Sequence, residues 1–89
     1  MKFRLFKGII EGNMYACLTG DFAGQMFMYF DKNDTEYEFL SVPTMINHQI
    51  PKDVFDNGLK SGIVEYVERP PRHVRNICKI QFQENRKNL

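Results

Sequence analysis

The first half of the chain alternates short apolar stretches with turn residues, a pattern typical of β-strands joined by tight connections. Gly12-Asn13 and Lys32-Asn33-Asp34 are turn signals, the Gly20–Gly24 segment reads as a flexible connection, and Pro43 ends the last stretch. The pattern therefore predicts an antiparallel meander of four strands, over residues 2–11, 13–19, 25–31 and 35–42.

The pattern changes after this meander. Residues 43–49 have no clear period, and we expect them to form an irregular crossing. Apolar residues then recur at helical spacing, between Pro51, which suits a first helical turn, and Gly62, which suits the left-handed position after a helix. We predict a short helix over residues 51–61. Gly58 lies on its apolar face and would permit a close approach to the sheet.

Two more strands are predicted near the C-terminus. Residues 63–68 (IVEYVE) are expected to form a fifth strand, and residues 74–83 place Val74, Cys78, Ile80 and Phe82 on one face of a sixth. Residues 69–73 would be a stiff hairpin loop, and residues 84–89 a frayed tail. The chain is thus expected to be one α+β domain, residues 1–89, with a mostly antiparallel sheet, one helix over a face and a C-terminal hairpin. The sheet could be open and twisted or form a small half-open barrel.

Two of the expected strands, over residues 13–19 and 25–31, are apolar on both faces. One short helix covers only part of a sheet face, so Tyr15, Phe27 and Tyr29 are candidates for an exposed patch that binds a partner protein or a second copy of the chain. The equally weighted alternative is that all three are ordinary core residues of strands covered on both faces.

The charge of the chain is unevenly distributed, although its net value is only +1. Residues 1–59 hold five Lys or Arg and eight Asp or Glu, a balance of −3, whereas residues 60–89 hold seven and three, a balance of +4. If the fold keeps these parts separate, the surface is polarised.

The basic part is concentrated around two consecutive prolines, which stiffen the backbone and present Arg69, Arg72, His73 and Arg75, with Lys79 nearby. Guanidinium groups match phosphates and carboxylates, so these residues are candidates for binding a nucleic acid, a nucleotide or an acidic protein surface. The alternative is a solvated loop whose charges serve solubility.

No motif for catalysis, a cofactor or a metal is present in the sequence. The acidic segment that starts at Asp31 lacks the central glycine and the final glutamate of a calcium loop, and the two histidines and two cysteines match no zinc spacing. Ser41 and Ser61 belong to no nucleophile motif, and the glycines form no phosphate loop. We therefore expect a protein that is not an enzyme and needs no cofactor or metal. A small enzyme with its site at a dimer interface is a third hypothesis.

The compartment follows from the cysteines and the N-terminus. Two cysteines, Cys17 and Cys78, are too few for a disulfide framework. Arg4 and Lys7 interrupt the first apolar stretch, so this stretch resembles neither a signal peptide nor a membrane span. We expect a cytoplasmic protein with free thiols and no membrane partner.

The small size, the many Asn, Lys, Phe and Ile residues and the lack of motifs resemble small accessory proteins of phages and mobile elements. This compositional resemblance implies a protein-binding module, such as an inhibitor that blocks a host factor in the host cytoplasm. The alternative function is a module that binds nucleic acid or nucleotides through the basic C-terminal part.

Overall fold

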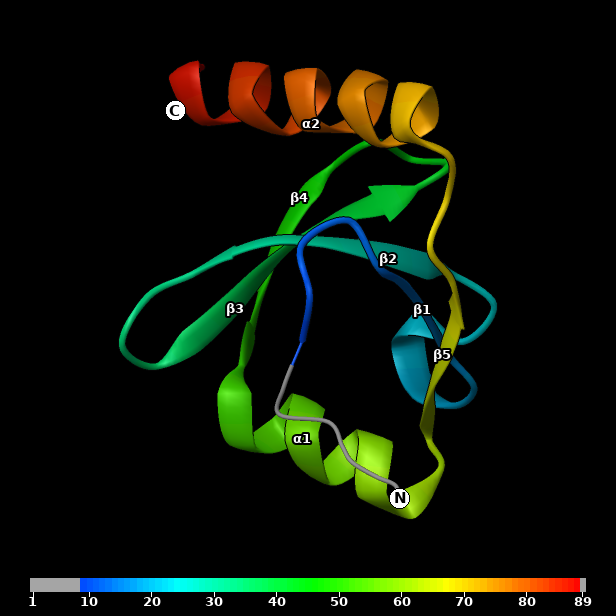
Figure 1. Ribbon diagram of the computed structural model, residues 1–89. Helices are drawn as coiled ribbons and strands as arrows, with labels where there is room; N and C mark the ends of the chain where they lie inside the picture. Colours follow the sequence, from blue (N-terminus) through cyan, green and yellow to red (C-terminus); the bar gives the residue numbers. More distant parts are fainter. Residues whose placement is uncertain (1–8, 89) are drawn as a thin grey trace.

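The computed structural model describes residues 9–88, which form an α+β fold with one five-stranded antiparallel sheet and two helices (Figure 1). In chain order the elements are β1 (Met14–Cys17), the short 3₁₀ helix η2 (Gly20–Phe22), β2 (Met26–Lys32), β3 (Glu36–Val42), β4 (Asn47–Pro51), α1 (Lys52–Ser61), β5 (Val64–Glu68) and α2 (Arg72–Lys87).

The strand order across the sheet is β4-β3-β2-β1-β5. The first four strands form an antiparallel meander, but only three of them were expected, because β4 takes the place of the strand predicted over 2–11. Helix α1 then carries the chain from one edge of the sheet to the other, where β5 pairs with β1. Within residues 9–88, β4 and β5 each pair on one side only. Because the sheet is not closed, the structure does not confirm the half-open barrel.

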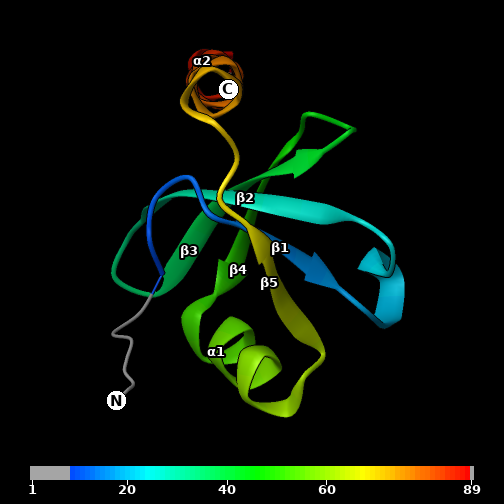
Figure 2. The ribbon, with the colours of Figure 1, turned by 45° about the vertical axis from the view of Figure 1, so that its right-hand side comes forward.

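The two helices cover opposite faces of the sheet (Figures 1 and 2). Side chains alternate along β2, so Phe27 contributes to the core under α1, whereas Met28 contributes to the core under α2. The helix on one face brings in Phe55, and the helix on the other brings in Cys78 and Phe82. Neither helix in the described part of the chain is long and apolar enough to cross a membrane.

Several predicted elements are confirmed. The strands expected at 25–31 and 35–42 and the helix expected at 51–61 match β2, β3 and α1 to within one residue at each end, whereas β1 is shorter than expected. Gly62 has the left-handed conformation (φ 83°) that ends a helix. A Cβ on Gly58 would lie 2.8 Å from Cγ2 of Val64, so its missing side chain allows α1 to contact β5.

The sixth strand, the C-terminal hairpin and the frayed tail are wrong, because residues 72–87 form the helix α2. Val74, Cys78 and Phe82 are four residues apart, so they share one face of a helix as readily as they share one face of a strand. They lie on the sheet side of α2, whereas Ile80, which the strand would have buried, is 60% exposed. Pro71, expected in a loop, caps the helix at its start.

The irregular crossing predicted for 43–49 is also wrong in part, because β4 begins at Asn47. This strand reads Asn-His-Gln-Ile-Pro, in which Ile50 is the one large apolar side chain and no alternation is visible, and it pairs with β3 through its backbone. Of the strand predicted over 2–11, residues 1–8 lie outside the described residues, and residues 9–11 are not in a strand.

Candidate functional site

The three residues expected in an exposed apolar patch lie in the core. Tyr15, Phe27 and Tyr29 are only 2%, 3% and 7% exposed. The ring of Phe55 from α1 packs edge-on against Tyr15, with 5.2 Å between the ring centroids. The prediction of an exposed patch is therefore wrong, and the alternative of a core covered on both faces describes these residues. The reason is the second helix: α2 covers one face, which leaves α1 the other.

An apolar pocket remains where α1 and the 3₁₀ helix η2 border the same face of the sheet. Its volume is about 530 Å³, and within the described chain its lining contains no Asp, Glu, Lys or Arg. Phe27 of β2 and Phe55 of α1 are the most deeply buried of the lining residues. Residues of β1, η2, β4, α1 and the start of β5 complete it: Cys17, Phe22, Ile50, Val54, Asn57, Gly58, Ser61, Ile63 and Val64.

The local sequence explains why apolar groups are exposed around this pocket. The tight η2 turn after β1 carries Phe22, whose ring packs edge-on against Phe27 at 5.7 Å between centroids yet stays 41% exposed. Helix α1 directs Phe55 inward, so its neighbour Val54 is left 58% exposed at the pocket. Ile63 is 43% exposed, and the backbone amide of Leu18 donates a 2.8 Å hydrogen bond to its carbonyl.

The charged residues next to the pocket in sequence are mostly acidic. Four carboxylates and one ammonium group directly adjoin lining residues: Asp21, Asp53, Asp56, Glu65 and Lys60. Asp56 also accepts a hydrogen bond from the Tyr37 hydroxyl at 3.0 Å. None of these five side chains lines the pocket, and Asp56 is bound to β3, so the lining itself is uncharged.

The two cysteines differ in their surroundings. Cys17 lines the pocket, and its thiol donates to the carbonyl oxygen of Thr19 at 3.2 Å. Cys78 lies on the sheet side of α2 and is buried, and this burial raises the pKa of its thiol. Both are free, and residues 9–88 hold no group of three His, Cys, Asp or Glu side chains that could bind a metal ion.

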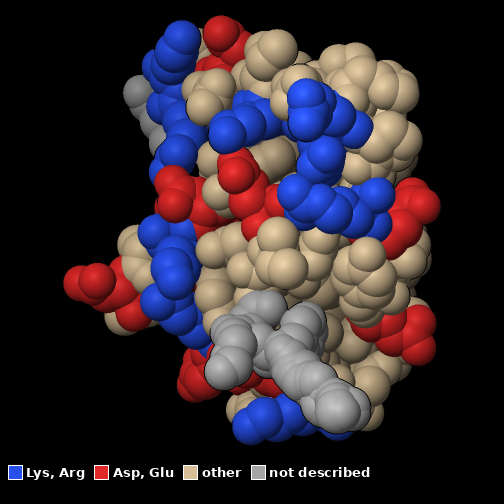
Figure 3. Space-filling view, viewed as in Figure 1, with Lys and Arg blue, Asp and Glu red and all other residues tan. Residues whose placement is uncertain are grey.

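The predicted basic residues separate into two groups. Arg69, Arg75 and Lys79 line one small hollow beside the 11–12 turn, whereas Arg72 and His73 are exposed in the first turn of α2 and do not line it. Figure 3 shows Lys and Arg side chains gathered over the α2 end of the molecule, with acidic side chains between them and the uncharged middle of this face.

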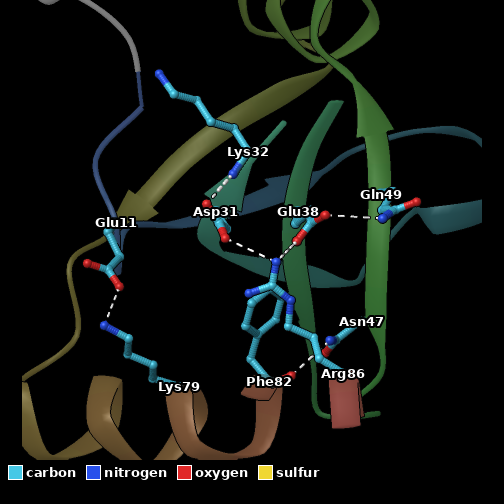
Figure 4. A network of polar contacts seen from close by, with 9 residues as sticks. All are labelled: Glu11, Asp31, Lys32, Glu38, Asn47, Gln49, Lys79, Phe82 and Arg86. Carbon is cyan, nitrogen blue, oxygen red and sulfur yellow. Dashed lines mark hydrogen bonds and ion pairs between the residues drawn. The ribbon is translucent and has the colours of Figure 1, made fainter. Parts of the chain in front are cut away.

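Several of these cations serve to hold α2 on the sheet (Figure 4). Arg86 bridges Asp31 and Glu38, at 3.0 and 2.8 Å, and Lys79 pairs with Glu11 at 2.7 Å. These groups already have acidic partners within the chain, so they are less able to attract a nucleic-acid backbone than the sequence indicated.

The pocket residues Phe22, Val54 and Ile63 were missed by sequence reasoning. Each comes from a different segment, and none belongs to a run of apolar residues that marks a surface. The available signal was weak: an aromatic residue inside the Gly20–Gly24 connection, and an extra apolar residue beside Phe55 in a short helix.

Comparison with known proteins gives no match: the chain fits no protein family, and neither a curated protein nor a solved structure is significantly similar to it.

Proposed function

We propose that the chain is a protein-binding module whose partner inserts apolar side chains into the pocket between α1 and the sheet. The observation that carries this proposal is the combination of a preformed apolar pocket with exposed Phe22, Val54 and Ile63 beside it. Such a module needs no catalytic group, because it acts by covering the surface of its partner.

The size and lining of the pocket support a protein partner over a polar small molecule. A volume of about 530 Å³ falls within the range of known binding pockets. A polar metabolite needs charged or strongly hydrogen-bonding groups that fix its orientation, and the lining offers few of them. Apolar anchors from a partner need only shape and the removal of water, and anchors in preformed pockets dominate many interfaces.

The lack of charge in the lining defines the partner further. None of the lining residues is an Asp, Glu, Lys or Arg, so the partner segment is expected to present uncharged apolar anchors at the contact. Burial of the anchors would supply most of the affinity.

Binding of nucleic acid along α2 is the less favoured proposal, because Arg86 is paired with acidic side chains of β2 and β3 and Lys79 with Glu11 of the turn before β1. A salt titration separates the two. Affinity carried by phosphate contacts falls steeply with salt concentration, whereas affinity carried by an apolar pocket changes little.

Site-specific photo-cross-linking tests the proposed surface. Phe22→p-benzoylphenylalanine places the probe at the pocket, and Ile80→p-benzoylphenylalanine places it on the exposed side of α2 as a control. Irradiation in a nuclease-treated cell lysate is expected to give a discrete protein adduct from position 22 and none from position 80. Adducts from position 80 alone would contradict the proposal, and an adduct of twice the mass of the chain would identify a second copy as the occupant.

A further inference from the structure

A second, much smaller hollow lies between the start of α2 and the turn before β1. Its volume is about 90 Å³, roughly three times the space of a water molecule in the liquid. The polar and glycine residues that line it come from this turn, from the segment after β5 and from α2: Glu11, Gly12, Arg69, Arg75, Asn76 and Lys79. Three cations that are up to ten residues apart in the sequence thus meet at one point.

The two arginines are held in place by the protein itself. Nη1 of Arg69 donates to the carbonyl oxygen of Glu11 and, at 3.2 Å, to Oδ1 of Asn13. Gly12 (φ 91°) lies against both side chains, because a Cβ there would be 2.6 Å from Cδ of Arg75 and 3.3 Å from Nη1 of Arg69. The Arg69 guanidinium and the aliphatic stem of Arg75 therefore lose little conformational freedom when a ligand arrives.

The charge of the hollow is positive and only partly compensated. Arg69, Arg75 and Lys79 contribute three positive charges and Glu11 one negative charge, which leaves +2. Lys79 is paired with Glu11 at 2.7 Å, but Nε of Arg75 is buried and has no hydrogen-bond acceptor among the described residues. Burying a guanidinium N–H without an acceptor is unfavourable, and an anion beside this group would offset part of that penalty.

We propose that this hollow binds the terminal phosphate group of a phosphate monoester. Two guanidiniums, an ammonium and the Asn76 amide offer donors to a compact tetrahedral dianion, and arginine is well suited to phosphate recognition. The volume accommodates the phosphate alone, so whatever carries it must extend into solvent. The site is separate from the apolar pocket, since α2 and α1 cover opposite faces of the sheet.

Titration with inorganic phosphate at constant ionic strength tests this site, followed by the amide NMR signals of Gly12 and Asn76. Saturable shifts are expected in the wild type. Arg75→Gln should weaken binding by about tenfold or more, because it removes a charge-assisted donor, whereas Arg72→Gln, which removes the same charge outside the hollow, should change it less than about twofold. Equal weakening by both variants, or no saturable shift in the wild type, would overturn the proposal.

Two further variants keep the test decisive if Arg75→Gln folds poorly. Glu11→Gln removes the competing carboxylate and frees Lys79, so phosphate binding should become stronger. Gly12→Ala should weaken phosphate binding, because the new methyl group displaces Arg75. Gly24→Ala is the control: Gly24 has a similar φ of 85°, but a Cβ there meets no atom within 4 Å, so binding should be unchanged. Weaker binding by Glu11→Gln, or equal effects of the two alanine variants, would contradict the proposal.

The nature of the phosphate carrier is tested with three small ligands. Adenosine monophosphate, a monoester, should bind at least as well as inorganic phosphate. Dimethyl phosphate, which mimics the nucleic-acid backbone, and acetate should bind about tenfold more weakly, because each carries one negative charge. If dimethyl phosphate or acetate bound as tightly as inorganic phosphate, the assignment to a monoester would be overturned.

Discussion

The two faces of the sheet are built from different interactions. Under α1, Phe55 contacts the rings of Tyr15, Tyr37 and Phe39, with centroid distances between 4.8 and 5.6 Å. Under α2, Phe82 contacts one ring, that of Phe30, and most of its other buried neighbours are Met, Leu and Cys side chains.

On the α2 face, polar contacts add to the apolar packing between the helix and the sheet. Asn47 donates to the carbonyl oxygen of Phe82 at 3.0 Å, and Asn85 donates to Oδ1 of Asn47 at 2.9 Å. Arg86 adds two ion pairs and lies over the Phe82 ring, 4.9 Å from its centroid. One helix is thus held by aromatic packing and the other by a less aromatic apolar core with polar contacts at its margin.

The two faces of the sheet also offer different surfaces for binding. Rigid rings pack edge-on and leave space between α1 and η2, which becomes an apolar pocket. The α2 face instead gathers charge, and its small hollow is lined by cations. Each face therefore has a binding chemistry that follows from the way its helix is attached.

The largest expected effect comes from removing the aromatic anchors. Phe55→Ala should lower the free energy of unfolding by about 3–5 kcal/mol, because it leaves a cavity among three rings. Phe82→Ala, equally buried, should cost less because its neighbours are flexible Met and Leu side chains that can close around the gap. Urea unfolding measures both, and a larger loss at Phe82 would contradict the comparison.

A smaller effect is expected from the polar margin of α2. Arg86→Ala should lower the free energy of unfolding by about 1–2 kcal/mol, and part of this loss should vanish at high salt, because the ion pairs are partly solvated. Lys87→Ala is the control, since Lys87 contacts only Glu84 on its own helix, and it should cost less than about 0.5 kcal/mol. Equal, salt-independent losses would show that the network does not hold α2.

The smallest effect is expected at the hydrogen bond between β3 and α1. Tyr37→Phe removes the hydrogen bond to Asp56 and should lower the free energy of unfolding by about 1 kcal/mol. Burial, together with the hydrogen bond to Asp56, raises the pKa of Tyr37 from 10.0 to about 12. The contribution of Tyr37 is therefore fully present below pH 10 and lost as the pH rises through 12.

Unfolding measured across this pH range checks the assignment. The difference in stability between the wild type and Tyr37→Phe should shrink between pH 10 and 12. A difference that stays constant or grows with pH would mean that the hydroxyl does not act through its protonated form.

The same comparison explains how much the sequence could predict. The α1 side was predictable, because Pro51 and Gly62 mark the ends of the helix and the strands of the meander are separated by turn residues. The α2 side was not, because Val74, Cys78 and Phe82 satisfy both a strand period and a helix period, and only packing against the finished sheet decides between them.

The candidate sites were less predictable than the fold. Phe22, Val54 and Ile63 come together through the turn after β1 and the crossing of α1, which no local pattern encodes. Of the predicted cations, Arg69, Arg75 and Lys79 do meet at one hollow. Gly12 was expected in a turn, but nothing in the sequence linked Gly12 or Glu11 to cations more than fifty residues further along the chain.

The most direct test of the proposed pocket compares two matched substitutions. Val54 and Ile80 are 58% and 60% exposed on α1 and α2, so an aspartate at either position should perturb the fold little. The affinity of a partner identified by cross-linking from position 22 is measured for the wild type, Val54→Asp and Ile80→Asp. Our account predicts at least about tenfold weaker binding for Val54→Asp and little change for Ile80→Asp. Loss of binding by Ile80→Asp with full binding by Val54→Asp would place the interface on α2 and contradict it.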